Sequence, residues 1–283
     1  MSKQHVKVLI YLKKNGSIAM SGLSHANLQY LRPLLEAGVL SEKRKGRGLI
    51  IIVDNTKAFE TFIEKNFPHG LEPDQTDTLM RCQAVSYWRN SKHGDLESEA
   101  VFISATKGHV LTRNSEILQI GQMTETAGIA SFLLCERSNN YWQFDGSIAL
   151  VENYEVFLHW QQIGVSADIA IWTAGRISRR MINWLKSQQM QKCRIFHCGD
   201  YDPVGLDEFC RLYGHMEHKV QLYIPTNIEA LFYKYSNSEL LQNKSSARIF
   251  ERLRFHSHPD VAQIVKLIDT HNAGLEQEIL LKY

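Results

Sequence analysis

The chain has 283 residues, 44% of them hydrophobic, and a formal net charge of +2 at pH 7. This composition supplies enough apolar material for a large core and for more than one domain. A net charge so close to zero does not by itself indicate a nucleic-acid partner, so that case must rest on local basic patches. The five scattered cysteines contain no Cys-x-x-Cys pair, which argues against a disulfide framework and against a structural zinc site.

The sequence shows no membrane-spanning or targeting pattern. No apolar run approaches the roughly 20 residues that cross a bilayer, and the first residues lack the pattern of a signal peptide. We therefore expect a soluble cytoplasmic protein that has no membrane partner.

The first 68 residues have the pattern of a winged helix-turn-helix domain. Apolar residues at helical spacing predict helices over 5–14, 25–37 and 57–66, and a basic turn over 41–48 leads into a β-rich run over 49–53. We interpret the basic residues of the turn as contacts for DNA phosphates. The alternative is a solvated turn on a protein-binding domain. The residues concerned are Lys43, Arg44, Lys45 and Arg47.

Residues 69–140 are expected to form a linker and a mixed connecting region. Two prolines in the polar stretch over 67–74 favour a linker, and a helix is predicted over 76–90. Short β-like runs follow, and the small basic loop over 104–108 contains Lys107. Lys107 is a candidate phosphate contact, and a plain surface turn is an equally good reading of this loop.

Strand and helix patterns alternate from about residue 141 to residue 283, which predicts an α/β domain with a mainly parallel sheet. Buried-type strands are expected over 147–151, 168–173, 194–198 and 220–224. The sequence therefore predicts helices on both faces of one sheet.

Acidic residues follow two of these predicted strands. Glu152 comes after the first, and Asp200 and Asp202 come after the third. Because the carboxyl ends of parallel strands meet at one edge of a sheet, the three carboxylates are expected to converge there and to repel one another. Such oxygen ligands suit Mg²⁺ or Mn²⁺ and predict metal-dependent phosphoryl chemistry. Taken alone, an Asp-x-Asp pair is more typical of turn and helix N-cap residues than of a metal site.

The order of these motifs resembles the Toprim fold of type IA and type II topoisomerases, bacterial primases and several nucleases. The sequence Gly199-Asp-Tyr-Asp-Pro-Val-Gly205, with Val151-Glu-Asn153 upstream, looks closest to one Toprim branch. That branch contains the topoisomerase VI A subunit, its meiotic DNA-break relatives and the Wadjet nuclease subunits called JetD or MksG. The loop over 104–108 resembles one that topoisomerase VI A subunits carry, and residues 275–278 resemble the C-terminal signature of the Wadjet subunits.

The resemblance implies a Toprim catalytic domain over 141–283 in which Glu152, Asp200 and Asp202 are catalytic metal ligands. It implies Glu278 as a further metal ligand, and we expect Arg176, which follows the second strand, to contact DNA. The implied activity is a homodimeric, Mg²⁺- or Mn²⁺-dependent endonuclease that cuts double-stranded DNA. The implied setting is defence against plasmids or phages beside an SMC-like ATPase complex.

Two other functions stay open at this point. Topoisomerase VI-like proteins attack DNA with a tyrosine in an Arg-x-x-Tyr-Tyr sequence, but Ala84 and Val85 occupy those tyrosine positions after Arg81. We therefore expect a metal-activated water as the nucleophile, with a transesterase that uses Tyr87 as the first alternative. The second alternative is a DNA-binding protein without catalytic activity.

Overall fold

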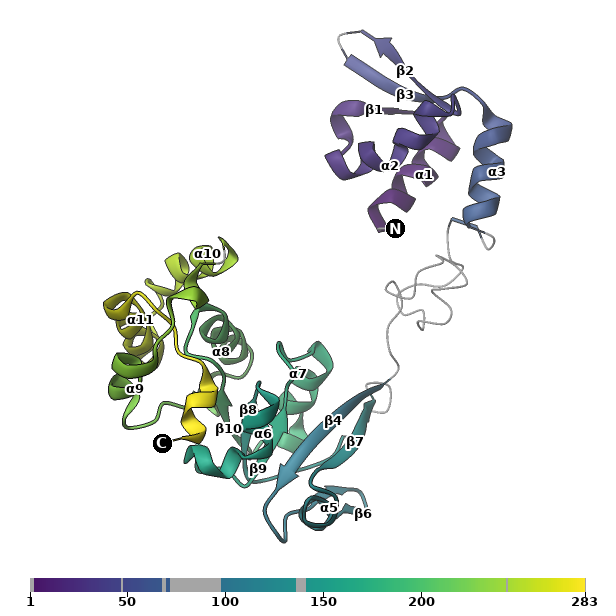
Figure 1. The fold of residues 1–283 in the computed structure, drawn as a ribbon. Coiled ribbons are helices and arrows are strands. Elements are labelled where there is room, and N and C mark those ends of the chain that lie inside the picture. Colours follow the sequence, from purple (N-terminus) through teal and green to yellow (C-terminus); the bar gives the residue numbers. More distant parts are fainter. Residues whose placement is uncertain are drawn as a thin grey trace. The chain divides into compact units, whose positions relative to one another are not determined.

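The computed structural model describes residues 3–46, 48–67, 70–71, 98–135, 141–242 and 244–282 (Figure 1). They fall into two compact units, one within Met1–Glu97 and the other within Ser98–Tyr283. Arg47, Tyr87, the predicted helix over 76–90 and most of the predicted linker lie outside the described residues.

The N-terminal unit combines helices with a small antiparallel sheet whose strand order is β1-β3-β2. Ser24 and Asn55 cap two of its helices by accepting hydrogen bonds from the backbone N–H groups of Asn27 and Ala58. The helices and the hairpin lie where the sequence predicts them. Its elements are α1 (Lys3–Asn15), β1 (Ser17–Ala19), η1 (Met20–Gly22), α2 (His25–Glu36), β2 (Leu40–Lys45), β3 (Gly48–Val53) and α3 (Thr56–Asn66).

The core of this unit is built from the apolar faces of its helices and the inner face of β3. Leu9, Leu12 and Leu31 on the helices and Ile51 on the sheet are fully buried. The last four residues of β2 and the first two of β3 are exposed, and the hairpin tip is the basic turn. The leucines at helical spacing therefore form the core of this unit, and the basic tip of the hairpin lies outside that core.

The C-terminal unit is an α/β structure around one six-stranded sheet with strand order β11-β10-β8-β9-β4-β7 (Figure 1). The first four strands in that order are parallel, and the last two join antiparallel. The predicted mainly parallel sheet is thus confirmed. The strands are β4 (Ser98–Ala105), β7 (Ala130–Cys135), β8 (Ser147–Val151), β9 (Ile169–Trp172), β10 (Arg194–Cys198) and β11 (Val220–Leu222).

Two of these strands precede residue 141. β4 and β7 lie in the region that we expected to form a connection, and the structure adds them to the sheet beside β9. A small hairpin of β5 (Leu111–Arg113) and β6 (Glu116–Leu118) lies between them in the chain. The same sheet therefore begins at residue 98.

Helices cover both faces of the parallel strands. The β8–β9 connection runs along the sheet in the opposite direction from the β9–β10 and β10–β11 connections. Right-handed crossovers therefore place α6 on one face and α7 and α8 on the other. The helices of this unit are α5 (Ile120–Ala127), α6 (Tyr154–Leu158), α7 (Arg179–Lys186), α8 (Pro203–Met216), α9 (Ile228–Tyr235), α10 (Lys244–Leu253) and α11 (Pro259–His271). Short 3-10 turns are η4 (Trp160–Ile163), η5 (Gln188–Met190), η6 (Glu217–Lys219), η7 (Ser238–Leu241) and η8 (Gln277–Leu281).

The sequence over 147–151 is almost entirely apolar because β8 is an interior strand of the sheet. All five residues of β8 are buried, because both of its faces are covered and both of its edges are paired. Among the described residues, no helix is long and apolar enough to cross a membrane.

Candidate active site

The acidic residues that the sequence singled out lie at the carboxyl edge of the parallel strands. Val151 at the end of β8 pairs with Cys198 at the end of β10, so Glu152 and the loop that carries Asp200 and Asp202 are neighbours. Gly199 leaves room for the buried ring of His197. A Cβ atom at Gly199 would lie 2.7 Å from the His197 ring and 3.7 Å from a carboxylate oxygen of Glu152.

Asp202 is the N-cap of α8. Its Oδ1 accepts a hydrogen bond of 2.7 Å from the Gly205 N–H, and Pro203 opens the helix in the first turn. The capping role considered for the Asp-x-Asp pair is therefore present at Asp202. A carboxylate has about four lone-pair directions on two oxygens, so one capping bond leaves acceptor capacity for a further ligand.

Gly205 is needed for the loop to close on itself. A Cβ atom at this position would lie 2.2 Å from the Asp200 carbonyl oxygen, closer than any side chain can approach. The buried His197 ring contacts the same turn, with its Nε2 3.2 Å from the Gly205 carbonyl oxygen. The Gly-x-x-x-x-x-Gly spacing of 199–205 thus fixes the orientation of both aspartates.

The C-terminal segment completes the site from a distance of more than seventy residues. Leu275 and Tyr201 form a two-way backbone bridge, with N···O distances of 2.9 and 3.1 Å. The Gln277 N–H donates to Asp200 Oδ1 at 2.9 Å, and the Asn153 side-chain amide donates to Glu278 Oε1. This segment therefore links the loop after β8 with the loop after β10 and brings Glu278 to the other carboxylates.

The carboxyl groups of Glu152, Asp200, Asp202 and Glu278, here termed the acidic cluster, all have raised pKa values. Burial, together with the charges of the other three and of Glu208, raises the pKa of Glu152 to about 7. Burial likewise raises the pKa of Asp200 to about 6, against the lowering effect of the Gln277 N–H. Burial also raises the pKa of Asp202 and of Glu278. A cluster with raised pKa values at a strand edge is typical of a functional site.

The chemistry of the acidic cluster fits a hard divalent cation. All of its ligands are carboxylate oxygens, which Mg²⁺ and Mn²⁺ prefer, and a cation would relieve their mutual repulsion. As these side chains lie, no group of three or more His, Cys, Asp and Glu residues in the described parts of the chain encloses a metal-binding cluster. To hold such an ion, the carboxylates would have to converge further than they do in this structure.

A protein-family model also matches the part of the chain that contains this site. The model described as "Wadjet protein JetD, C-terminal" matches residues 128–282. The chain belongs to the JetD family. No curated protein matches it. As a JetD family member, the chain is a component of the Wadjet antiplasmid defence system, in which JetD works within a multi-subunit complex.

The JetD match contains every member of the acidic cluster and the segment that ties it together. The match begins just before β7 and ends at residue 282, the last described residue. The N-terminal unit and β4 lie outside it.

Arg176, a predicted DNA contact, lies beside α8 in an ionic network. Its guanidinium pairs with Asp207 and lies 3.6 Å from Glu208, and 53% of the side chain is exposed. Asp207 also pairs with Arg252 of α10. The pairing of Asp207 with Arg176 and with Arg252 was not predicted, because these arginines are 31 and 45 positions away from Asp207 in the chain.

The other predicted DNA contacts lie elsewhere. Lys107 follows β4, and since Ala105 pairs with Ile169 at the start of β9, it lies at the sheet edge opposite the acidic cluster. Its side chain is exposed and pairs with Glu125 at 3.4 Å. Lys43, Arg44 and Lys45 are exposed on the hairpin of the N-terminal unit, where Lys43 lies 3.7 Å from Asp54.

Two residues near the acidic cluster were not predicted. Gln277 is 1% exposed, and its amide forms no hydrogen bond of ordinary geometry among the described residues, although it lies close enough to Asp200 to lower the pKa of that carboxyl. Asn153 orients Glu278 and also caps α6 by accepting from the Glu155 and Val156 N–H groups. Both belong to motifs quoted from the sequence, but their roles depend on contacts that only the fold supplies.

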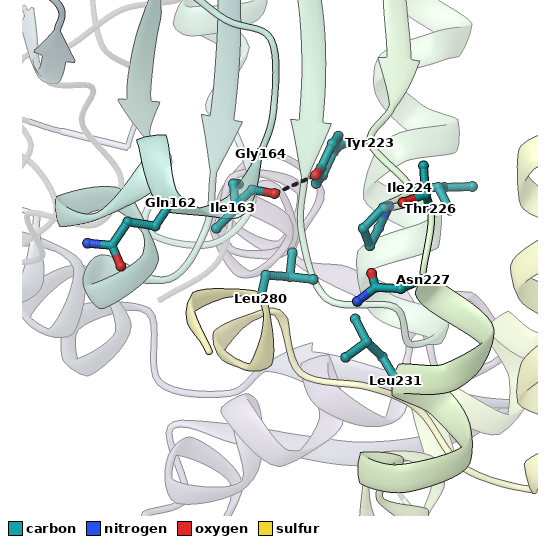
Figure 2. A pocket seen from close by; sticks show the side chains of 10 residues that line it. Gln162, Ile163, Gly164, Tyr223, Ile224, Thr226, Asn227, Leu231 and Leu280 are labelled. Carbon is teal, nitrogen blue, oxygen red and sulfur yellow. Dashed lines mark hydrogen bonds between the residues drawn. The ribbon is translucent and has the colours of Figure 1, made fainter. Parts of the chain in front are cut away.

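A cavity of about 430 Å³ opens at the same edge of the sheet, beyond the end of β11 (Figure 2). Its wall contains Leu280, two residues after Glu278, and the Tyr223 hydroxyl, which donates to the Ile163 carbonyl oxygen (Figure 2). The described residues that line this cavity include no Asp, Glu, Lys, Arg or His. These lining residues supply no charged group for phosphoryl chemistry, whereas the acidic cluster consists of carboxylates.

Proposed function

We propose that this JetD family member is a divalent-metal-dependent DNA endonuclease whose active site is the acidic cluster. The observation that carries the proposal is the gathering of four carboxylates with raised pKa values at the carboxyl edge of a parallel sheet. Glu152, Asp200 and Asp202 are the proposed catalytic metal ligands, with Glu278 as a further ligand. The fold of residues 141–283 that supports them is proposed to be a Toprim domain, extended by β4 and β7.

When bound, Mg²⁺ or Mn²⁺ would stabilise charge on the scissile phosphate and lower the pKa of a coordinated water. The chain's part is to hold its carboxylates in place. The backbone N–H of Gln277 orients Asp200, that of Gly205 orients Asp202, and the Asn153 amide orients Glu278. Such fixed outer contacts are what a metal-binding carboxylate needs.

Glu152 differs from the other members of the acidic cluster. Its carboxylate has no hydrogen-bond donor among the described residues, and its pKa of about 7 lets it take and release a proton near neutral pH. We propose that Glu152 combines a ligand role with proton transfer from the attacking water.

DNA contacts are proposed on both units. Arg176 and its neighbour Arg252 are more than half exposed and lie on the α8 side of the acidic cluster, where they can pair with phosphates. The N-terminal unit is proposed to be a winged helix whose exposed Lys43, Arg44 and Lys45, with Arg47, follow the DNA backbone. Double-stranded DNA is the proposed substrate, and a homodimer beside an SMC-like ATPase complex is the proposed assembly.

The experiment is plasmid cleavage by the purified chain with Mg²⁺ or Mn²⁺. Asp200→Asn keeps the shape of the loop but removes one charge, and Asp269→Asn is a matched control on the exposed end of α11. The proposal expects nicked or linear DNA from the unsubstituted chain and from Asp269→Asn, and none from Asp200→Asn. The partner ATPase complex is added in a second series, because the isolated chain can depend on it.

Two results would replace the proposal. Covalent protein–DNA adducts would indicate a tyrosine transesterase, for which Tyr87 was the candidate. Metal-independent DNA binding without cleavage in both series would indicate a DNA-binding protein without catalytic activity.

A further inference from the structure

A second cavity lies at the opposite edge of the six-stranded sheet, where β10 begins. Its volume is about 460 Å³, and it is bounded by the end of α7, the residues before β10, the end of α8 and η6. The acidic cluster follows the other end of the five-residue strand β10, so roughly 16 Å of strand separates the two. Six basic side chains, together termed the basic pocket, line this cavity: Lys186, Lys192, Arg194, His215, His218 and Lys219.

The basic pocket has little compensating negative charge. Among the described residues no Asp or Glu lines it, although Asp168 lies close enough to Arg194 for their charges to interact. Within the described parts of the chain, its ion pairs are Lys192 with Asp145 at 3.8 Å and His218 with Glu217 at 4.0 Å. All four of these side chains are at least half exposed, and ion pairs of that kind contribute little. The pocket therefore keeps a surplus of positive charge.

One member of the pocket is held in place by the fold. The Lys219 ammonium donates to the Leu185 carbonyl oxygen at 2.7 Å and to the Met190 carbonyl oxygen. Lys186, Arg194 and His215 surround it from α7, β10 and α8 and are exposed. Basic groups from three separate elements thus converge on one cavity, whereas a merely solvated basic helix face would present them along one element.

The pocket's composition indicates the kind of anion that it takes. Its surplus of lysine, arginine and histidine nitrogens suits phosphate oxygens. No Phe, Tyr or Trp ring from the described parts of the chain lines it, so these residues offer no platform on which a base could stack. The phosphate backbone of a nucleic acid satisfies both conditions.

We propose that the basic pocket binds the phosphate backbone of duplex DNA as a second contact, apart from the acidic cluster. This inference rests on the proposed function, which makes DNA the substrate. Because β10 lies between the two sites, they contact different stretches of the DNA. The pocket supplies affinity and orientation, and the acidic cluster supplies the chemistry.

The test is the salt dependence of duplex binding by the full chain in EDTA, measured by fluorescence anisotropy of a labelled duplex. The variant Lys186→Gln/Arg194→Gln removes two charges from the pocket. The control Lys266→Gln/Arg254→Gln removes one lysine and one arginine charge from exposed positions on and near α11. Far-ultraviolet circular dichroism and thermal unfolding establish that both variants are folded.

The proposal expects the pocket variant to bind about tenfold more weakly and its slope of log K against log salt to fall by about two, one unit for each lost phosphate contact. The control is expected to keep the affinity and slope of the unsubstituted chain. Equal slopes in all three proteins would overturn the proposal, even if Asp200→Asn abolishes cleavage and so supports the active site. No duplex binding by the unsubstituted chain, alone and beside the partner ATPase complex, would overturn this proposal, whereas the cleavage series decides the proposed active site separately.

Inorganic phosphate as a competitor separates a polymer site from a small-anion site. If phosphate binds the unsubstituted chain but not the pocket variant, and both bind duplex DNA equally, the pocket is a small-anion site and the proposal fails.

Discussion

The backbone N–H of Gln277 donates a 2.9 Å hydrogen bond to Asp200 Oδ1, across 77 positions of sequence. This bond opposes the effect of burial and lowers the pKa of Asp200 from the value that burial alone would give. With the Leu275–Tyr201 bridge, it makes the C-terminal segment a structural part of the acidic cluster. The buried side chain of Gln277 also lowers the pKa of Asp200, but its amide forms no hydrogen bond of ordinary geometry among the described residues.

The variant Gln277→Met tests the role of the side chain alone. Methionine has a similar length, and the variant keeps the backbone N–H that donates to Asp200. A buried amide without a partner costs stability, so we expect the variant to gain about 1 kcal/mol in free energy of unfolding. If the amide holds a water or a ligand beside Asp200, DNA cleavage should fall about tenfold. Urea unfolding and plasmid nicking measure the two effects. A variant that is more stable and fully active would assign Gln277 a packing role alone.

Asp202 has a structural role and a proposed chemical role, which two substitutions distinguish. Asn is as good an N-cap as Asp, so Asp202→Asn should keep stability, whereas Asp202→Ala should lose about 1 kcal/mol. Both are expected to lose cleavage, because neither supplies a negative oxygen ligand. Thermal unfolding and cleavage are measured on the same preparations. Substantial cleavage by Asp202→Asn would limit this residue to capping α8.

The raised pKa of Glu152 predicts how stability depends on pH in EDTA. The folded protein binds a proton at Glu152 up to about pH 7, whereas the unfolded chain releases it near 4.5. The folded state therefore binds more protons in this window, and its stability should fall as pH rises from about 4.5 to about 7. Asp200, with a pKa of about 6, acts in the same direction.

Glu152→Gln should flatten this pH dependence, and Mg²⁺ should restore stability above pH 7 because it binds the folded state. Denaturant unfolding across this pH range is the measurement. A steeper or unchanged slope in Glu152→Gln would mean that Glu152 is not the titrating group.

Glu208 supports the site from within α8. It is 4% exposed, accepts from the Ile177 N–H at 3.0 Å and holds Arg211 Nε at 2.8 Å. Burial raises the pKa of this carboxyl, but the Arg211 and Ile177 hydrogen bonds outweigh it and leave the pKa lowered. Glu208→Ala should cost about 3 kcal/mol, because it leaves a guanidinium and a buried N–H without their acceptor. Glu251→Ala on the exposed face of α10 is the control, and a similar small change in both would contradict the role given to Glu208.

Local patterns in the sequence predict much of what positions the acidic cluster. The apolar runs before Glu152 and Asp200 indicate buried parallel strands, and strand polarity then places both acids at one edge. Gly199 and Gly205 show in the sequence as turn residues, although the closeness of Gly199 to the His197 ring and of Gly205 to the Asp200 carbonyl appears only in the structure.

The remaining features depend on pairing that no local pattern encodes. β4 has a strand-like sequence, but nothing in it specifies that it joins the sheet antiparallel to β9, which places Lys107 at the far edge. The bond from Gln277 to Asp200 and the convergence of Lys186, Arg194 and His215 likewise arise from segments far apart in the chain.

The most direct test of the acidic cluster is calorimetric titration of the full chain with Mn²⁺. Binding should be seen for the unsubstituted chain and for Asp269→Asn, and the affinity of Asp200→Asn and of Glu152→Gln should be lower by at least about tenfold. Loss of binding that is confined to the cluster variants would establish that these carboxylates hold the ion. Equal Mn²⁺ affinity in all four proteins would contradict the metal site on which the proposed endonuclease depends.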